Sequence, residues 1–243
     1  MIVLFTDFGS ADPYIGQVKV VLHRYAPRTP VVEALNDAPD FGIEPAAHLL
    51  AGLAPHYPRG SVFFTVVDPG VGGPREAIVV EAEGRRFVGP DNGLLSLVWQ
   101  RAKRRACRRI VWRPAALSSS FHGRDLFAPV AASLARGRPP PRWFVAMRAP
   151  RVLLDPADLA RVIYIDHYGN AMTGLRAAGI APGVRLRAGG RTLSRAGTFS
   201  EVRHGATFWY ANSFGLAEIA ANQGSAARNL GLRVGSPVAV IRS

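Results

Sequence analysis

The hydrophobic pattern of the first half of the chain alternates between short apolar runs and longer stretches with helical spacing. Runs rich in branched and aromatic residues predict buried strands at residues 2–5, 31–34, 61–67 and 77–80. Between them, residues 14–25 and 43–56 carry apolar side chains three and four positions apart, as amphipathic helices do. Strands that alternate with helices form βαβ units, so we expect an α/β fold with a mostly parallel sheet and helices on both faces.

A proline-rich stretch divides the chain. Residues 138–156 contain five prolines and predict a linker without regular structure. Beyond it, shorter strand-like segments are separated by glycine-rich turns; they are residues 162–165, 184–187, 207–210 and 238–241. We therefore expect an N-terminal α/β domain over residues 1–150 and a smaller C-terminal antiparallel β domain over residues 158–243.

The charge balance is strongly basic. The 243 residues are 48% hydrophobic and 19% charged, which is typical of a globular chain, and 30 cationic residues against 17 acidic ones give a net charge of +13. Such an excess favours polyanion partners. The densest cluster spans residues 101–109 and has no alternating aromatic residues of the kind that bind single strands. We interpret it as the solvated surface of a helix, with a nucleic-acid-binding surface as the alternative.

The single cysteine, Cys107, cannot form an internal disulfide, which fits a reducing compartment. No apolar stretch approaches the roughly 20 residues of a membrane span, so we expect no membrane partner. The amino terminus reaches acidic Asp7 without a basic leader. We expect a cytoplasmic protein.

Polar residues follow two of the predicted strands, where open α/β sheets bind ligands. Asp7 follows the first strand and could accept hydrogen bonds from a diol such as a ribose, or cap the next helix. Asp68 follows the strand at 61–67 and opens a glycine- and proline-rich loop that ends at Arg75. The carboxylate and the guanidinium could pair across this loop, for catalysis or as a structural salt bridge. The loop lacks the lysine and the spacing of a phosphate-binding loop.

A third polar loop precedes the apolar stretch at 126–134. It contains three consecutive serines, Ser118 to Ser120, followed by Phe121, His122 and Asp125. The imidazole could transfer protons near neutral pH; alternatively, Ser120 or Asp125 caps the helix and His122 is a surface residue. No GxSxG motif supports a serine nucleophile, and the six scattered histidines include no HExxH motif or pair at helical spacing. We therefore predict no metal site.

Six motifs together resemble one protein family, and they occur in the family's order over nearly the whole chain. They are TDFG (residues 6–9) with Asp12, Tyr14 and Gly16, VVDPGVG (66–72) with Arg75, GPDNGLLS (89–96), FHGRDLFAP (121–129), IDHYGN (165–170) and NSFGLAEIAANQGSA (212–226). Together they are similar to the S-adenosylmethionine hydroxide adenosyltransferases, relatives of the bacterial fluorinase and chlorinase.

The resemblance implies a two-domain homotrimer with active sites between the first domain of one subunit and the second domain of its neighbour. It also implies hydrolysis of S-adenosyl-L-methionine, as substrate and without a cofactor, to adenosine and L-methionine. Asp68, Arg75 and His122 match the family's catalytic Asp-Arg-His set. Halide-using relatives carry other residues in place of Asp68 and His122, so these two argue for an oxygen nucleophile.

The chemistry of this reaction centres on the attacking water. A neutral thioether leaves from a sulfonium and needs no proton, whereas free water is a poor nucleophile with a pKa of about 15.7. We expect Asp68 and His122 to hold one water in line with the carbon–sulfur bond and to accept its proton, with Arg75 orienting Asp68. Either Asp68 or His122 could take the proton.

The resemblance also implies substrate-binding positions. Asp7 matches the residue that accepts the ribose hydroxyls, Asn170 and Asn222 belong to the adenine pocket, and Tyr168 and Phe199 flank the purine. Ser213 and Glu218 match residues that hold the methionine end, with Glu218 facing its ammonium. Further substrate contacts are expected from Phe41, Ser120, Phe121 and Asp166. The aromatic residues could instead belong to the core of the β domain, and Glu218 could be a surface charge.

One segment departs from the family pattern. Residues 35–41 lack the usual histidine-containing turn and place Asn36, Asp37, Pro39 and Phe41 there, so Phe41 could form an apolar lid over the sulfonium side. Two rival hypotheses remain: a nucleic-acid-binding protein with a vestigial nucleoside pocket, and an enzyme that uses a halide as nucleophile.

Overall fold

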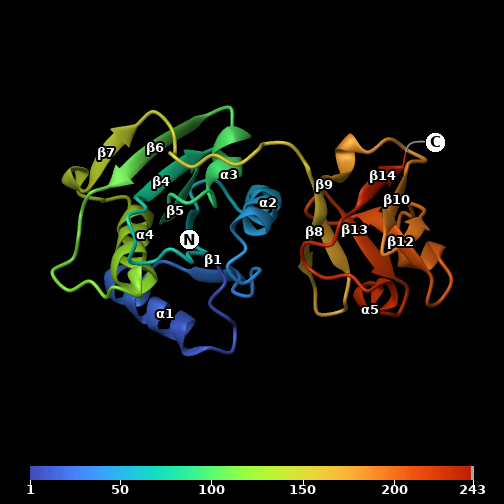
Figure 1. The fold of residues 1–243 in the computed structure, drawn as a ribbon. Coiled ribbons are helices and arrows are strands. Elements are labelled where there is room, and N and C mark those ends of the chain that lie inside the picture. Colours follow the sequence, from blue (N-terminus) through green and yellow to red (C-terminus); the bar gives the residue numbers. More distant parts are fainter. Residues whose placement is uncertain (242–243) are drawn as a thin grey trace. The chain divides into compact units, whose positions relative to one another are not determined.

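The computed structural model describes residues 1–241 and divides the chain into two compact units, Met1–Pro156 and a second unit that begins at Ala157 (Figure 1). Each unit has its own hydrophobic core.

The first unit is built on one seven-stranded sheet. Its strands are β1 (Ile2–Thr6), β2 (Val31–Leu35), β3 (Val62–Val66), β4 (Ala77–Ala82), β5 (Arg85–Pro90), β6 (Arg105–Ile110) and β7 (Phe144–Met147). They lie in the order β2-β1-β3-β5-β4-β6-β7. Strands β1, β2, β3 and β5 are mutually parallel, and β6 joins them in direction because β4 is antiparallel to both β5 and β6. The sheet is therefore mostly parallel, with β4 and β7 reversed.

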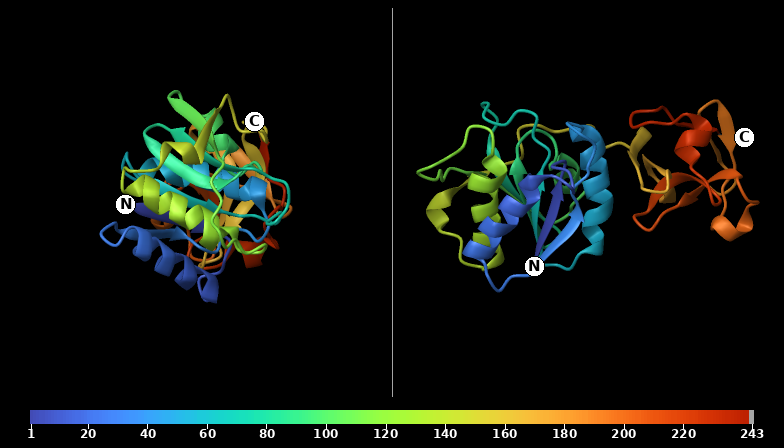
Figure 2. Two further views of the ribbon diagram at one scale, coloured as in Figure 1. Left: turned by 90° about the vertical axis from the view of Figure 1, so that its left-hand side faces the viewer. Right: turned by 90° about the horizontal axis from the view of Figure 1, so that it is seen from below.

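Helices cover both faces of this sheet, as the βαβ pattern predicts (Figure 2). The α-helices are α1 (Pro13–Tyr25), α2 (Ile43–Leu53), α3 (Ser96–Gln100) and α4 (Ala128–Ala135), the last preceded by a π-helical turn, η2 (Gly123–Phe127). Short 3₁₀ turns are η1 (Ala54–His56) and η3 (Pro141–Trp143). Helix α1 packs against α4, and α2 packs against α3.

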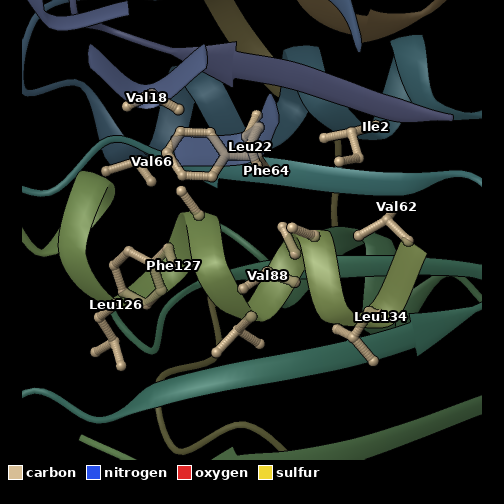
Figure 3. Packing of buried hydrophobic residues seen from close by; sticks show 14 of the residues in the cluster. Ile2, Val18, Leu22, Val62, Phe64, Val66, Val88, Leu126, Phe127 and Leu134 are labelled. Atoms are coloured by element: carbon tan, nitrogen blue, oxygen red, sulfur yellow. The ribbon is translucent and has the colours of Figure 1, made fainter. Parts of the chain in front are cut away.

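The central strands of the first unit are continuous apolar runs because both of their faces lie in the core. All residues of β1 and β3 are buried, because a sheet covered on both faces has no solvent side. Phe64 and Val66 lie with Val18 and Leu22 of α1 and Phe127 of η2 in one cluster (Figure 3). On the other face, Phe63 stacks on Phe87 with ring centroids 4.7 Å apart.

The second unit consists of two small antiparallel sheets. One contains β8 (Leu159–Ile165), β9 (Ala171–Arg176), β12 (Thr207–Ala211) and β13 (Leu216–Ala221), in the order β12-β13-β9-β8. The other contains β10 (Arg185–Ala188), β11 (Arg191–Leu193) and β14 (Ala239–Ile241). Helix α5 (Ala226–Leu230) and the 3₁₀ turns η4 (Ala177–Gly179) and η5 (Phe199–Glu201) connect them. Trp209 is fully buried in the core.

Two predictions about local structure are wrong. The arginine cluster does not form a helix, because residues 105–110 form strand β6, where pairing with β4 and β7 overrides local helical preference. Arg108 and Arg109 of this strand make ion pairs with Glu81 and Glu76.

The proline-rich stretch is also not free of regular structure. Its prolines flank residues 144–147 without interrupting them, and these residues pair with β6 as the edge strand β7. The irregular connection is therefore shorter than predicted and lies after Met147.

Among residues 1–241, no helix combines the length and the apolar character that crossing a lipid bilayer requires.

Replacing Phe64 by alanine tests the core that supports the site. The fully buried ring packs between α1 and α4, so Phe64→Ala should lower the free energy of unfolding by about 3–5 kcal/mol. Chemical denaturation measures this change. Val20→Ala, on the exposed side of α1, is the control and should change stability by less than about 0.5 kcal/mol. Equal effects of the two substitutions would contradict this packing.

Candidate active site

Two aspartates meet at the carboxyl edge of the sheet. Asp7 follows β1 and Asp68 lies just beyond β3, and these strands are adjacent and parallel. Both side chains line a cavity of about 520 Å³ together with Phe41, Ser120, Phe121 and His122. Helix α1 begins at Pro13, with Asp12 at its N-cap position, so Asp7 is free of the capping role that its sequence position allowed.

Arg75 joins Asp68 and His122. Its Nε donates to both carboxylate oxygens of Asp68, at 3.1 and 3.0 Å, and its Nη2 also donates to Oδ2. The same Nη2 lies 3.0 Å from Nδ1 of His122. The Asp68 and Arg75 side chains are only 4% and 12% exposed, so the predicted pair across the loop is confirmed as a largely desolvated one.

The contact with Arg75 determines the tautomer of His122. A guanidinium can only donate hydrogen bonds, so Nδ1 of His122 must be the acceptor. The imidazole is then neutral, with its proton on Nε2. Burial, and next the positive charge of Arg75, lower the pKa of His122 below 6.5, which favours the same neutral form.

A close backbone contact joins the Asp68 loop (residues 68–75) to the serine loop (residues 118–122), which carries the three serines and His122. Gly72 has φ +80°, and a Cβ at this position would lie 2.5 Å from the carbonyl oxygen of Ser119. Only glycine allows the Asp68 loop to approach the serine loop this closely.

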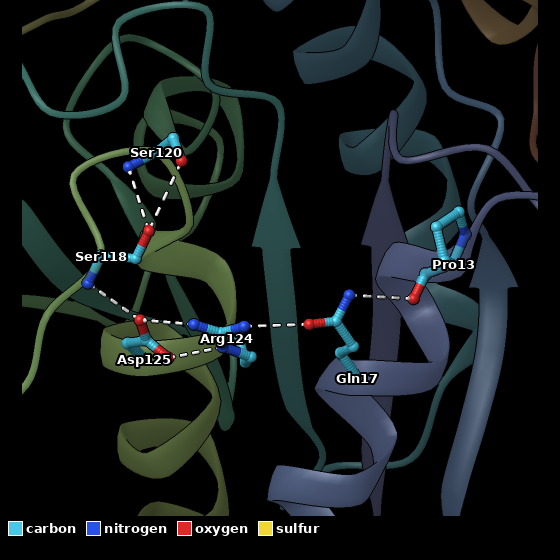
Figure 4. Close-up of polar contacts among 6 residues, drawn as sticks. All are labelled: Pro13, Gln17, Ser118, Ser120, Arg124 and Asp125. Atoms are coloured by element: carbon cyan, nitrogen blue, oxygen red, sulfur yellow. Dashed lines mark hydrogen bonds and ion pairs between the residues drawn. The ribbon is translucent and has the colours of Figure 1, made fainter.

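The serine loop is held by charged side chains (Figure 4). Asp125 accepts the backbone N–H of Ser118 at 2.9 Å and pairs with Arg124, which donates to Gln17 of α1 at 2.9 Å. Asp125 therefore fixes the loop that carries His122, although it does not act as a side-chain cap of the following helix.

Asp7 and Phe41, which both line the first cavity, are joined by a hydrogen bond. Oδ2 of Asp7 accepts the backbone N–H of Phe41 at 3.2 Å. Burial raises the pKa of the Asp7 carboxyl above its usual range, and the carboxylates of Asp40 and Asp68 add to this effect. Phe41 has φ +57°, a left-handed conformation that costs energy for a bulky residue and is common in ligand-binding loops.

Asn36 ties the end of β1 to the loop that follows β2. Its buried side chain accepts from Thr6 at 3.2 Å and donates to Glu33 at 2.5 Å. Its carbonyl oxygen accepts from the N–H of Gly9 at 2.8 Å. The end of β1 and the loop that carries Phe41 are therefore fixed relative to each other.

A second cavity, of about 730 Å³, lies in the second unit. Its lining includes Asp166, Tyr168, Asn170, Phe199 and Asn222. These five predicted substrate-binding residues come from three separate segments, which the four-stranded sheet and α5 bring to one place.

Asn170 presents an unused acceptor in this second cavity. Its Nδ2 donates to Asp166 at 2.9 Å, which fixes the orientation of the amide. Its Oδ1 is buried and, among the described residues, has no hydrogen-bond partner. A buried acceptor without a partner costs free energy, so this atom is a candidate contact for a ligand donor.

Two aromatic side chains stand out by their exposure. Phe41 is 73% exposed and Tyr168 is 74% exposed, more than any other large hydrophobic residue in the described chain. Phe41 lines the first cavity and Tyr168 the second. Exposed aromatic residues at cavities are typical of sites that bind flat or apolar ligands.

Glu218 and Ser213 lie outside the residues that line the second cavity. Glu218 is 2% exposed and accepts from Tyr210 Oη at 2.6 Å and from Asn212 Nδ2 at 2.7 Å, so it is not a surface charge. Burial raises its pKa above 4.5, against the lowering effect of these two hydrogen bonds. Ser213 is exposed in the turn between β12 and β13.

Several lining residues were not among the predicted substrate contacts. Asp40 in the first cavity and Tyr210 in the second are examples. Tyr210 lies directly opposite Glu218 in the pairing of β12 with β13. Because the sequence pattern does not predict β13, it could not indicate that these two residues are neighbours.

The sequence models of both domains of one family match this chain. The S-adenosylmethionine hydroxide adenosyltransferase N-terminal domain matches residues 2–143, and the C-terminal domain of the same family matches residues 160–239. The chain belongs to the S-adenosylmethionine hydroxide adenosyltransferase family.

Individual relatives span nearly the whole chain. An (R)-S-adenosyl-L-methionine hydrolase of Thermus thermophilus is 41% identical, covering 97% of both chains. A protein of the same name from Salinispora tropica is 36% identical over 97% of this chain and 95% of its own. A crystal structure of an uncharacterized conserved protein from Thermotoga maritima superposes with a TM-score of 0.90 at 31% identity, covering 99% of this chain and 100% of that one.

A halide-using relative is more distant. A fluorinase of Actinopolyspora mzabensis is 26% identical over 100% of this chain and 97% of its own.

The contact between Arg75 and His122 predicts a measurable titration. Nuclear magnetic resonance of the His122 ring should give a midpoint below pH 6.5, because protonation would place an N–H against the guanidinium. Arg75→Gln removes that positive charge and should raise the midpoint; Arg142→Gln, outside the residues that line the cavity, is the control and should leave it unchanged. A midpoint above 6.5 in the unaltered protein would show that the ring is not held in its neutral form.

Proposed function

We propose that this protein hydrolyses S-adenosyl-L-methionine to adenosine and L-methionine. The observation that carries the proposal is the Asp68–Arg75–His122 cluster at the edge of a cavity that also contains Asp7 and Phe41. Relatives that share 41% and 36% identity over the whole chain are named (R)-S-adenosyl-L-methionine hydrolases. We propose the same preference for the (R) sulfonium.

The reaction is a displacement at the ribose 5′ carbon. An oxygen lone pair of water forms the new carbon–oxygen bond, and the carbon–sulfur bond breaks with its electron pair going to sulfur. The sulfur leaves as a neutral thioether, so no acid is required there. The site must instead hold one water in line with the breaking bond and remove one of its protons.

The geometry favours Asp68 as the proton acceptor. The accepting nitrogen of His122 is already engaged by Arg75, so Nε2–H can donate to the water oxygen but cannot take a proton from it. Asp68 has two oxygens with lone pairs beyond those used by Arg75. His122 then orients the water, Arg75 holds both partners, and the proton passes to Asp68.

Residues that line the first cavity and residues that line the second cavity would together hold the nucleoside. We propose that Asp7 accepts the ribose hydroxyls and that Phe41 covers the sulfonium side, with Ser120 and Phe121 completing that wall. The buried Oδ1 of Asn170 would accept a hydrogen bond from the exocyclic amino group of adenine. Tyr168 and Phe199 would stack on the purine, and Asp166 and Asn222 would complete the pocket.

The methionine end of the substrate is assigned to the hairpin formed by β12 and β13. Ser213 is exposed in its turn, and Glu218 supplies a carboxyl group beneath Tyr210. A substrate ammonium nearby would favour the ionised form of Glu218 and lower its raised pKa.

Substitutions of the cluster test this function. Asp68→Asn and His122→Ala should each lower kcat by about 10²–10⁴-fold, because each removes a group that holds or deprotonates the water. Both variants should still bind adenosine in calorimetry. His23→Ala, on the exposed side of α1, is the control and should keep full turnover. Full activity in either cluster variant would remove the proposed roles.

The same assay separates hydrolysis from halide transfer. Chromatography of reactions with and without chloride should show adenosine in both. A 5′-chloro nucleoside as the main product would favour the alternative that a halide is the nucleophile. The 26% identical relative named fluorinase is the reason to test this alternative.

We propose a cytoplasmic homotrimer in which the first domain of one subunit and the second domain of its neighbour form each active site. The assembly has a direct test: Asp68→Asn and Asn170→Ala, each nearly inactive alone, should regain part of the activity when the two variants are unfolded and refolded as a mixture. Some mixed sites would then combine two intact halves. No recovery, with light scattering showing a single subunit, would contradict the shared site.

A further inference from the structure

The motif GPDNGLLS at residues 89–96 has no role in the chemistry described above. It forms the end of β5, a tight turn and the start of α3. We propose that Asp91 in this turn is a positioning residue for catalysis, because it fixes the segment that leads to the second unit while the adjacent Asn92 fixes the Asp68 loop. This proposal rests on the proposed hydrolase function.

The Asp91 carboxylate holds the chain just before the second unit begins. Its Oδ2 accepts the backbone N–H of Arg151 at 2.9 Å, and its Oδ1 accepts that of Val152 at 3.4 Å. Asp91 itself is 4% exposed. Burying a carboxylate is costly unless hydrogen bonds compensate, so this position is built around the two N–H groups that it holds.

Helix α3 adds further contacts to the same segment. Oγ of Ser96 accepts the N–H of Leu154 at 3.3 Å, and Nε2 of Gln100 donates to the carbonyl oxygen of Leu154 at 2.8 Å. Arg101 donates to the carbonyl oxygen of Pro156 at 3.3 Å. Residues 152–156 have no helix or strand, so these side chains take the place of regular secondary structure in fixing them.

Glycine is required at the centre of the turn. Gly93 has φ +106°, and a Cβ there would lie 3.3 Å from the Leu154 side chain. The turn and the segment are therefore in direct contact.

The same turn holds the catalytic loop. Nδ2 of Asn92 donates to the carbonyl oxygen of Val67 at 2.9 Å, and Val67 directly precedes Asp68. The N–H of Asp91 donates to the carbonyl oxygen of Glu76, which directly follows Arg75. One turn thus fixes both ends of the loop that carries the Asp68–Arg75 pair, and it fixes the path of the chain toward Ala157.

These contacts separate two effects on catalysis. The proposed adenine contacts lie in the second unit, so a loosened segment at 151–154 should weaken substrate binding and leave the Asp68 cluster intact. A loosened Asn92 should disturb Asp68 and slow the chemical step. Asp91 is therefore expected to act on KM and Asn92 on kcat.

Kinetics of three variants and one control test this inference. Asp91→Ala should raise KM for S-adenosyl-L-methionine about tenfold, the fold-change of roughly one lost hydrogen bond to a charged group, with kcat within about twofold of the parent value. Asp91→Asn keeps one acceptor oxygen and should give a smaller rise. Asn92→Ala should instead lower kcat. Arg148→Gln is the control, since this exposed side chain lies in the same connection and makes none of the contacts described above, and it should leave both constants unchanged.

Hydrogen exchange provides a readout that does not depend on turnover. The amides of Arg151, Val152 and Leu154 should be protected in the parent protein and exchange faster in Asp91→Ala, while those of β1 and β3 keep their protection. If Asp91→Ala does not fold, Ser96→Ala removes the acceptor for Leu154 alone and should show a smaller rise in both KM and exchange.

The outcomes distinguish the two proposals. An inactive parent protein with a protected, Asp91-dependent segment would overturn the hydrolase function but not the anchoring. Parent-like KM and exchange in Asp91→Ala, or a loss confined to kcat, would overturn the positioning role of Asp91.

Discussion

The candidate active site depends on one guanidinium group. Arg75 binds the carboxylate of Asp68 and the imidazole of His122 at the same time, and it is almost buried while doing so. Removing one partner from a buried pair costs about 3–5 kcal/mol, because the remaining charge has no compensation. The cluster is therefore a unit, because Arg75 fixes both the position of Asp68 and the tautomer of His122.

The surrounding fold keeps this unit in place through short, specific contacts. The parallel strands β1 and β3 deliver Asp7 and Asp68 to one edge, and Gly72 lets the Asp68 loop touch the serine loop. Asp125 holds the serine loop, and the turn at residues 91–93 holds the Asp68 loop from the other side. Loops that are fixed in this way hold the side chains that line the first cavity in one arrangement.

Much of this arrangement could be predicted from the sequence, because local patterns carry it. The apolar runs of β1 and β3 end directly before polar residues, and seven positions separate Asp68 from Arg75, a spacing that allows a pair across a glycine-rich loop. The family motifs then grouped residues that lie far apart in the sequence, and the matches to both domain models place the chain in that family.

The sequence was less informative where tertiary contacts decide the outcome. Strand β6 is rich in arginine and forms because β4 and β7 pair with it, and β7 lies within a proline-rich stretch. The burial of Glu218 beneath Tyr210 depends on the register of β12 and β13, which no local pattern specifies. The unused acceptor of Asn170 likewise depends on packing around Asp166.

Isotopic labelling would show whether Asp68, Arg75 and His122 direct one water to the ribose 5′ carbon. Purified protein would be incubated with S-adenosyl-L-methionine in water enriched in ¹⁸O, and both products would be analysed by mass spectrometry. If water attacks the 5′ carbon, adenosine will carry one ¹⁸O atom in its 5′ hydroxyl and methionine will carry none. Adenosine without the label, or no adenosine at all, would show that the cluster does not direct water to this carbon.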